Sequence, residues 1–392
     1  MKHDFLTGLR TLVRHRPSPL RLFALAPLLP LLFSSAHSQL AVQIREIDTL
    51  NITSHTGMKP QSKLWQQDGI WWGCFADSTG THIWQLDGDH WTRSFELTSD
   101  TLVRADVKAH DWGITVLLFS GVQSSVIQCA YFKESKRYDL LDQTIVTLDE
   151  GVETATIDSD GDGLLWIASD SENQVNVRWK GPSDRAFSEP ITLVDGISKD
   201  DICVITSLGH GRVGVLWSNQ NTQRYGFRRH VAATEPESWF PDEVPAEISA
   251  IRHGDGMSDD HLNIAVSSDG TLYATVKTSY DTEGMPLVAC LIRRPHGKWD
   301  PLYHVDDEGS RGIMLLDESR KTFYVVYTSY RDNSIVFKSS STDSIAFSER
   351  VTLMEGRRIN NVSSTRQNVS GTFPIVASQG DSLMHTVIVE VE

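Results

Sequence analysis

The stretch NIAVSSDGTLYATVKTS (residues 263–279) contains two short apolar segments, NIAVS and VKTS, on either side of a Ser-Asp-Gly turn. Asp-Gly between alternating apolar residues is a strong signal of a β-hairpin. The second segment ends in a small polar residue, and this ending recurs. Its other copies are CFAD (74–77), LLFS (117–120), WIAS (166–169), VLWS (215–218), VYTS (326–329) and IVAS (375–378).

The last residues of these copies are spaced 43, 49, 49, 61, 50 and 49 apart. A period near 50 is typical of a four-stranded propeller blade. Each copy has a strand about ten residues upstream, such as TATID (154–158), and a third strand downstream, such as QVNVRWK (174–180). A fourth often follows, such as FSEPITLV (187–194). The sequence therefore predicts an all-β, seven-bladed β-propeller with four-stranded antiparallel blades, whose strands are named A to D.

The last repeat has three strands, at 361–365, 373–378 and 383–391, and no fourth. The segment LAVQIREIDTL (40–50) resembles an outer strand and would supply it. Closing the ring in this way removes the open edges of a linear array. We therefore expect residues 39–392 to form a single domain. Two packed sandwiches are the alternative, and the near-equal units favour the propeller.

The N-terminus has the features of a signal peptide spanning residues 1–38. Residues 1–21 carry five positive charges and one negative charge, an apolar stretch covers 22–33, and small residues stand at 36 and 38. The alternative is an uncleaved anchor, but twelve apolar residues are short for a span of about 20. We expect cleavage before Gln39, no transmembrane segment in the mature chain, and a secreted, periplasmic or cell-surface location.

The chain is acidic, with a formal net charge of −15. Nonspecific nucleic-acid binding requires clustered Lys and Arg, so it is not expected. The four cysteines lie in apolar strands without CxxC spacing, which favours buried free thiols over a disulfide between blades. A closed ring needs no partner for stability, and we expect a monomer.

Propeller topology places the D–A and B–C loops on one face, called here the D–A/B–C face, where propellers generally bind ligands. His261 on this face is a candidate acid/base, and Tyr280 and Asp260 are further catalytic candidates. The alternative for 258–261 is a polar loop that caps a strand. The longest repeat spacing puts an insertion at about 240–260, where it could form a wall or lid.

The same face carries candidate ligand-binding residues. The arginines suit carboxylates or sulfates, and the tyrosine suits stacking on a sugar ring. The set is Arg311, Arg331, Arg358, Tyr330, Asn361, Asp201 and Asp281. Alternatively, the arginines pair with the abundant acids, and Tyr280 and Tyr330, which occupy equivalent positions, pack between blades. Asp106, Asp201 and Asp260 could bind Ca²⁺ around the channel, with strand caps as the alternative.

The turn around Ser159, Gly163 and Trp166 resembles the Asp-box (BNR repeat), with Gly161 at the position of the box's Asp. The chain thus resembles the sialidase-like group of secreted β-propellers over residues 40–392. The segments DDHLNIAV and LIRRPHGKWDPLY are similar to segments of secreted bacterial propellers of unassigned function. The resemblance to the sialidase-like group implies an exported β-propeller, and no activity follows from the likeness of the two segments.

The sequence therefore favours carbohydrate binding, with an anionic polysaccharide as ligand at the D–A/B–C face. The first alternative is a polysaccharide-active enzyme. A uronate polysaccharide lyase would use Arg311 or Arg358 to neutralise the carboxylate and His261 or Tyr280 to take the C5 proton. A sialidase-like glycoside hydrolase would need two carboxylates, for which Asp201 and Asp260 are candidates. The second alternative is a cell-surface protein-interaction module.

Overall fold

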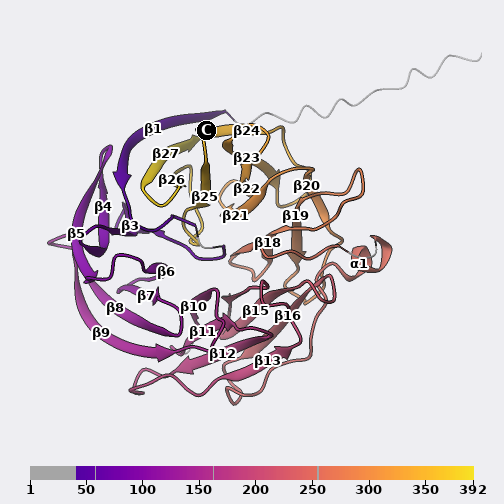
Figure 1. The fold of residues 1–392 in the computed structure, drawn as a ribbon, viewed down its shortest axis with the longest axis horizontal. Coiled ribbons are helices and arrows are strands. Elements are labelled where there is room, and N and C mark those ends of the chain that lie inside the picture. Colours follow the sequence, from indigo (N-terminus) through magenta and orange to yellow (C-terminus); the bar gives the residue numbers. More distant parts are fainter. Residues whose placement is uncertain (1–40, 58, 162, 254–255) are drawn as a thin grey trace, which may run out of the picture. The chain divides into compact units, whose positions relative to one another are not determined.

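The computed structural model describes residues 41–57, 59–161, 163–253 and 256–392, so the expected signal peptide lies outside the described residues. Seven antiparallel sheets are arranged as a ring (Figure 1). Their order along the chain follows the seven repeats. The prediction of an all-β seven-bladed propeller is confirmed.

The first three blades are complete four-stranded sheets. Blade 1 consists of β2 (Leu64–Gln67), β3 (Ile70–Asp77), β4 (Gly80–Asp87) and β5 (His90–Thr98). Blade 2 consists of β6 (Arg104–His110), β7 (Gly113–Phe119), β8 (Gln123–Phe132) and β9 (Arg137–Thr147). Blade 3 consists of β10 (Ala155–Ser159), β11 (Leu165–Asp170), β12 (Gln174–Lys180) and β13 (Ile191–Asp195).

Blade 4 departs from the prediction of four strands in every blade. It consists of β14 (Cys203–Gly209), β15 (Arg212–Asn219) and β16 (Arg224–Val231). The place of an outer strand is taken by residues 239–243, which make two isolated bridges, Trp239 to His230 and Glu243 to Phe227. The insertion expected at 240–260 begins here and continues into the short helix α1 (Glu247–His253). The insertion has thus replaced the regular outer strand.

The remaining blades are four-stranded. Blade 5 consists of β17 (Leu262–Val266), β18 (Leu272–Lys277), β19 (Val288–Arg293) and β20 (Tyr303–Asp306). Blade 6 consists of β21 (Ser310–Asp317), β22 (Thr322–Ser329), β23 (Ser334–Ser341) and β24 (Val351–Glu355). Blade 7 consists of β25 (Ile359–Ser363), β26 (Thr372–Gln379), β27 (Leu383–Val391) and β1 (Val42–Asn51).

The ring closes as the sequence predicts. Strand β1 pairs antiparallel with β27, from Val42 opposite Val391 to Asn51 opposite Leu383. In Figure 1 the indigo strand β1 lies along the yellow strand β27. The first and last parts of the described chain therefore share one sheet.

Apolar side chains fill the spaces between neighbouring blades. Between blades 1 and 2, Trp65, Trp72 and Tyr138 are almost fully buried, and the Trp65 indole N–H donates to the Tyr138 hydroxyl over 2.7 Å. The four cysteines are buried and free, as expected from their spacing. In the described part of the chain no helix is long and apolar enough to cross a membrane.

The inner strands have no ladder partner on the channel side, so their backbone N–H groups need other acceptors. Side chains of the preceding blade supply them. The Asp106 side chain accepts from the Ile157 amide at 2.8 Å. In the same way, Thr156 accepts from the Ile205 amide at 3.0 Å and Asn263 from the Met314 amide at 2.9 Å. A polar side chain on the inner strand thus joins each of these blades to the next.

A segment without a recognisable sequence motif crosses the channel mouth (Figure 1). This crossing segment, described at residues 52–57 and 59–63, lies between β1 and β2. It bonds to inner strands around the ring. Gln61 donates to the Ala155 carbonyl at 2.9 Å, Asn263 to the Pro60 carbonyl at 3.3 Å, and Thr56 to the Asn361 carbonyl at 2.6 Å. Contacts with blades 3, 5 and 7 require the segment to span the channel.

Candidate functional site

The crossing segment brings a lysine to the candidate histidine. The side chain of Lys59 is 5% exposed, and its ammonium lies 2.6 Å from Glu153 Oε1 and 3.0 Å from Asp260 Oδ2. The other oxygen of Asp260 contacts Nδ1 of His261. Together with Asp259 these residues are called the mouth cluster. It joins loops of blades 3 and 5 to the crossing segment.

Asp259 is the second carboxylate beside the histidine. Its oxygens accept from Lys277 Nζ at 2.9 Å and Ser279 Oγ at 2.7 Å. Burial opposes ionisation here, but hydrogen bonds from His261, Lys277 and Ser279 hold the pKa of Asp259 well below its ordinary value. Asp259 is therefore ionised at neutral pH.

Among the described residues, Asp259, Asp260 and His261 form a group close enough to hold a metal ion. However, the ammonium groups of Lys277 and Lys59 already lie against the two carboxylates. These two positive charges offset the charge that would attract a cation. The arrangement therefore fits an ion-paired cluster better than a calcium site.

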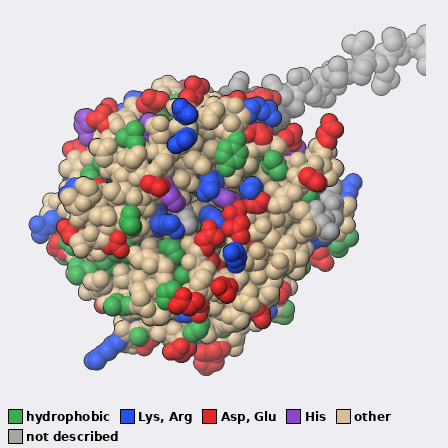
Figure 2. Space-filling model, in the orientation of Figure 1, with side chains coloured by type: hydrophobic (Ala, Val, Ile, Leu, Met, Phe, Trp, Pro, Cys, Tyr) green, Lys and Arg blue, Asp and Glu red, His purple; other side chains and the backbone are tan. Residues whose placement is uncertain are grey.

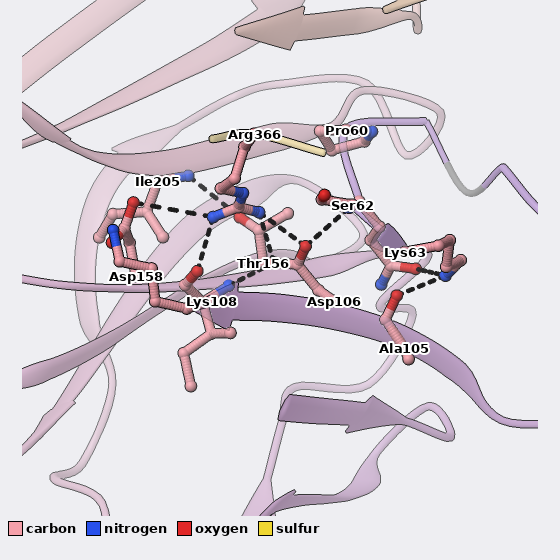
Figure 3. A network of polar contacts seen from close by, with 12 residues as sticks. Pro60, Ser62, Lys63, Ala105, Asp106, Lys108, Thr156, Asp158, Ile205 and Arg366 are labelled. Atoms are coloured by element: carbon pink, nitrogen blue, oxygen red, sulfur yellow. Dashed lines mark hydrogen bonds and ion pairs between the residues drawn. The ribbon is translucent and has the colours of Figure 1, made fainter. Parts of the chain in front are cut away.

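The structure does not bring together the three aspartates considered for Ca²⁺. Asp106 is buried and makes two contacts with Arg366, at 2.6 and 2.7 Å (Figure 3). Asp201 is buried and accepts from the backbone amides of Ser198 and Gln220. Asp260 lies in the mouth cluster. Asp106 and Asp201 thus have structural partners in different loops.

Tyr280 lies beneath the insertion and outside the mouth cluster. It is 7% exposed and belongs to the apolar core with Tyr225, Ala250 and Met257. Its hydroxyl is buried and has no partner among the described residues. Burial raises the pKa of Tyr280, although the charge of Arg224 opposes this. Tyr280 therefore serves the packing of the insertion in this conformation.

Arg311 and Asn361 lie in β-bulges of the first strands of blades 6 and 7. Both have positive φ, 55° and 57°, which is unfavourable for residues other than glycine. Bulges often redirect a side chain beside a functional site. Arg311 Nη1 donates to Asn361 Oδ1 at 3.2 Å, whereas Nε is buried without a partner in the described chain. These two predicted residues are therefore in contact.

The other predicted ligand-binding residues are exposed on the same face. Tyr330 is 56% exposed, in contrast to the buried Tyr280 at the equivalent position of the preceding blade. Arg331, Arg358 and Asp281 are also exposed. The structure thus places these four residues on the surface and not in a common pocket.

Several arginines of this face have no carboxylate partner among the described residues. They are Arg104, Arg311, Arg331, Arg357 and Arg358. Figure 2 shows Lys and Arg, Asp and Glu, and His side chains gathered near the centre of one ring face.

The sequence did not indicate Lys59 and Glu153 as site residues, because a single charged residue in a loop does not reveal its partner.

No known protein family matches the sequence, and no curated protein matches it. Solved structures do match the fold. An ulvan lyase of polysaccharide lyase family PL25, bound to -[GlcA(1-4)Rha3S]-, is 12% identical with a TM-score of 0.53, over 86% of this chain and 95% of that one. The WD40 domain of coronin from Toxoplasma gondii is 10% identical with a TM-score of 0.53, over 89% and 88%.

A second structure of a PL25 ulvan lyase is 11% identical with a TM-score of 0.54, over 87% of this chain and 95% of that one. Identities this low establish the propeller fold alone. The lyases and the coronin domain share that fold while their names indicate different roles. The likeness to the sialidase-like group is not supported by a family match.

Proposed function

We propose that this protein is an exported propeller that binds an anionic polysaccharide at its D–A/B–C face. The observation that carries the proposal is the group of arginines on this face without carboxylate partners, in a chain with a net charge of −15. In such a chain carboxylates are abundant, and most other arginines pair with one. Guanidinium groups left unpaired are suited to the carboxylates or sulfates of a ligand.

The electrostatic environment of the crossing segment supports an anionic ligand. The pKa of His55 is lowered to about 4, first by burial and then by the positive charges of Lys63 and Arg104. Burial is the largest cause of this shift, and the charges of Lys63 and Arg104 add to it while Asp381 opposes them. The two positive charges favour a carboxylate or sulfate over a neutral sugar.

The shape of the site supports a polymer that lies on the surface. The channel beside the crossing segment retains a cavity of about 10 Å³ lined by Pro60, Asn263 and Arg366, which is room for about one water. A ligand therefore remains on the face, where Tyr330 offers an exposed ring for stacking. The ulvan lyase structure, with its bound uronate and sulfated sugar, adds weight through the shared fold.

The test is binding to heparin and alginate, with dextran as the neutral comparison. The double variant Arg311→Gln/Arg358→Gln should lower affinity for the charged polymers at least tenfold, since each lost charge contact contributes about 1 kcal/mol. Arg185→Gln is the matched control, because Arg185 is exposed in the loop between β12 and β13, on the opposite face. Equal losses in the two variants, or no binding at low salt, would refute the proposal.

A second candidate, a uronate polysaccharide lyase, rests on the contact between Asp260 and His261, which leaves Nε2 of His261 without a partner among the described residues. A carboxylate that orients an imidazole is a recurrent acid/base arrangement. Nε2 is buried, however, which favours the binding function. Release of unsaturated uronate from alginate or ulvan, lost in His261→Ala and retained in Tyr280→Phe, would support the lyase.

A glycoside hydrolase has less support than the lyase. It would need Asp201, whose carboxylate is buried and bonded to backbone amides.

If the protein is exported and its signal peptide is cleaved, the secreted protein should begin at Gln39, which N-terminal sequencing would check. A monomer predicts a single species near the mass of residues 39–392 in sedimentation.

A further inference from the structure

A second hollow lies on the opposite side of the ring, where the A–B and C–D loops emerge, called here the A–B/C–D face. It is lined by residues of blades 1 and 7 and has a volume of about 70 Å³, which is room for roughly two water molecules. The half-buried Trp71 forms its apolar wall. The polar residues of this hollow, called the A–B pocket, are Gln66, Gln367, Asn368, Ser370 and Thr372.

Two amide side chains of the A–B pocket are held in place by their own hydrogen bonds. Gln367 Oε1 accepts from the Gln66 backbone amide at 2.7 Å, and Gln367 Nε2 donates to the Gln66 carbonyl at 3.2 Å. Asn368 Nδ2 donates to Glu318 Oε1. These contacts join the first turn of blade 1 to the loops of blades 6 and 7, so the pocket is a fixed feature of the surface.

The A–B pocket keeps neutral polar groups free for a ligand. Ser370 and Thr372 are exposed, and neither hydroxyl has a partner among the described residues. A hydroxyl can both donate and accept a hydrogen bond. An apolar wall beside a few neutral polar groups suits the hydroxymethyl group of a hexose, whose carbon can contact Trp71 while its hydroxyl bonds to Ser370 or Thr372.

An exposed indole lies on the next turn of the same face. Gln67, at the turn beside the pocket, donates to the Asp111 carbonyl at 3.2 Å, and Trp112 follows Asp111. Trp112 is 42% exposed and stacks on His110, with ring centroids 4.6 Å apart and planes 8° from parallel. The His110 ring also contacts Thr115 Oγ1 at 3.0 Å. One side of the indole is therefore supported, and the other is open for stacking on a sugar ring.

The charges on this part of the A–B/C–D face disfavour an acidic sugar. Burial lowers the pKa of His110 to about 4, and the charge of Lys108 adds to this against the effect of nearby aspartates, so the imidazole under the indole is neutral at pH 7. Asp111 is exposed beside Trp112, and Glu318 lies at the pocket. Carboxylates at both places repel an anionic saccharide.

We propose that the A–B/C–D face carries a second saccharide site, which binds a neutral β-linked hexose chain through Trp112 and the A–B pocket. One sugar ring stacks on the indole, and a hydroxymethyl group of the chain enters the pocket beside Trp71. This site goes beyond the proposed function, since its residues and its ligand chemistry differ from those of the arginine-bearing face. With both sites, one ring could contact an acidic and a neutral polysaccharide on opposite faces.

The experiment is titration calorimetry of the full-length protein with cellohexaose and xylohexaose. Both chains are neutral and share one linkage, but only cellohexaose carries hydroxymethyl groups. Cellohexaose should bind about fivefold more tightly, which is the effect of one hydrogen bond between neutral groups. Trp112→Ala should weaken the binding of both chains roughly tenfold, because both lose the stacking surface, whereas Trp112→Phe should retain most of it.

The pocket is tested by the double variant Ser370→Ala/Thr372→Val, which removes two exposed hydroxyls with little change in shape. Its affinity for cellohexaose should fall to that for xylohexaose, and its affinity for xylohexaose should not change. Dextran uses the hydroxymethyl carbon in its linkage, so it should not occupy the pocket. Equal affinities of the wild-type protein for cellohexaose and xylohexaose would mean that the pocket holds water only, which would overturn the proposal.

Tyr330→Ala is the matched control, because it removes an exposed aromatic ring from the D–A/B–C face. It should leave cellohexaose binding unchanged, and Trp112→Ala should leave heparin binding unchanged. Absence of cellohexaose binding, or equal losses in Trp112→Ala and Tyr330→Ala, would also overturn the second site. Neither result bears on heparin binding by the arginines, so failure of this proposal is distinct from failure of the proposed function.

Discussion

Asp170, at the end of β11, is a buried acid whose role is structural. Its carboxylate accepts from the backbone amides of Glu153 at 2.6 Å and Thr154 at 2.9 Å. Burial nevertheless raises its pKa to about 7, against the effect of these hydrogen bonds. The residue thus fixes the loop that carries Glu153, the second partner of Lys59.

The raised pKa predicts a pH dependence of stability. The folded state binds more protons than the unfolded state between about pH 4 and pH 7, so the free energy of unfolding should fall as pH rises through this window. The full shift corresponds to roughly 4 kcal/mol. Asp170→Asn should remove this contribution. Urea unfolding of both proteins at pH 4, 5.5 and 7 measures the difference, and parallel pH profiles would contradict the assignment.

At the scale of elements, the insertion between β16 and β17 depends on Tyr280. Gly256 has positive φ, and a Cβ there would lie 3.0 Å from the Tyr280 ring. The tyrosine belongs to the same buried apolar cluster as Ala246 and Ala250, which lie just before and within α1. The insertion therefore rests on this ring, and the equivalent Tyr330, which has no insertion above it, is exposed.

Tyr280→Ala should lower the free energy of unfolding by about 3 kcal/mol, because a buried ring is lost. Tyr280→Phe should change it by less than about 0.5 kcal/mol, since the hydroxyl has no partner among the described residues. Tyr330→Ala is the matched control, and like Tyr280→Phe it should change the free energy of unfolding by less than about 0.5 kcal/mol. Chemical denaturation measures all three. If Tyr280→Phe were as damaging as Tyr280→Ala, the hydroxyl would have a role that packing does not explain.

At the scale of the whole molecule, the ring depends on the pairing of β1 with β27. The Glu392 amide donates to the Ala41 carbonyl at 3.0 Å, and antiparallel pairing repeats such contacts at every second residue. The N–H of Arg45, opposite Ile388, therefore points at β27, and that of Glu46 points away. Neighbouring positions of one strand thus differ in their role in closure.

Arg45→Pro should lower the free energy of unfolding by roughly 2–3 kcal/mol, because proline removes a ladder hydrogen bond. Glu46→Pro should cost much less, and Arg45→Ala controls for the exposed ion pair with Asp89. The loss should appear in a single cooperative transition measured by circular dichroism. Equal effects of the two prolines would contradict closure through this register.

Much of the fold could be predicted because its signals are local. Asp269-Gly270 and similar turns specify hairpins, and the alternating strands specify their buried faces. The missing fourth strand of the last repeat indicated that residues 40–50 close the ring. Blade 4 was predicted less well, since the bridges of Trp239 and Glu243 depend on how the insertion packs.

The candidate site could be predicted only in part. The sequence placed all four of these residues on one face, and two contacts form there. Arg311 contacts Asn361, and Asp260 contacts His261. Tyr280 and Asp201 have structural partners that neither strand pattern nor spacing indicates. Asp201, for example, accepts from the amide of Gln220, and only the path of the B–C loop sets that contact.

The sequence by itself determined the number of blades, their order and the face on which each loop emerges, because hairpin turns and strand alternation act over a few residues. Only the tertiary structure decided which polar groups meet. Lys59 lies about 200 positions before Asp260, and no local pattern relates them. Their contact depends on the crossing segment, whose course is set by hydrogen bonds to inner strands from all around the ring.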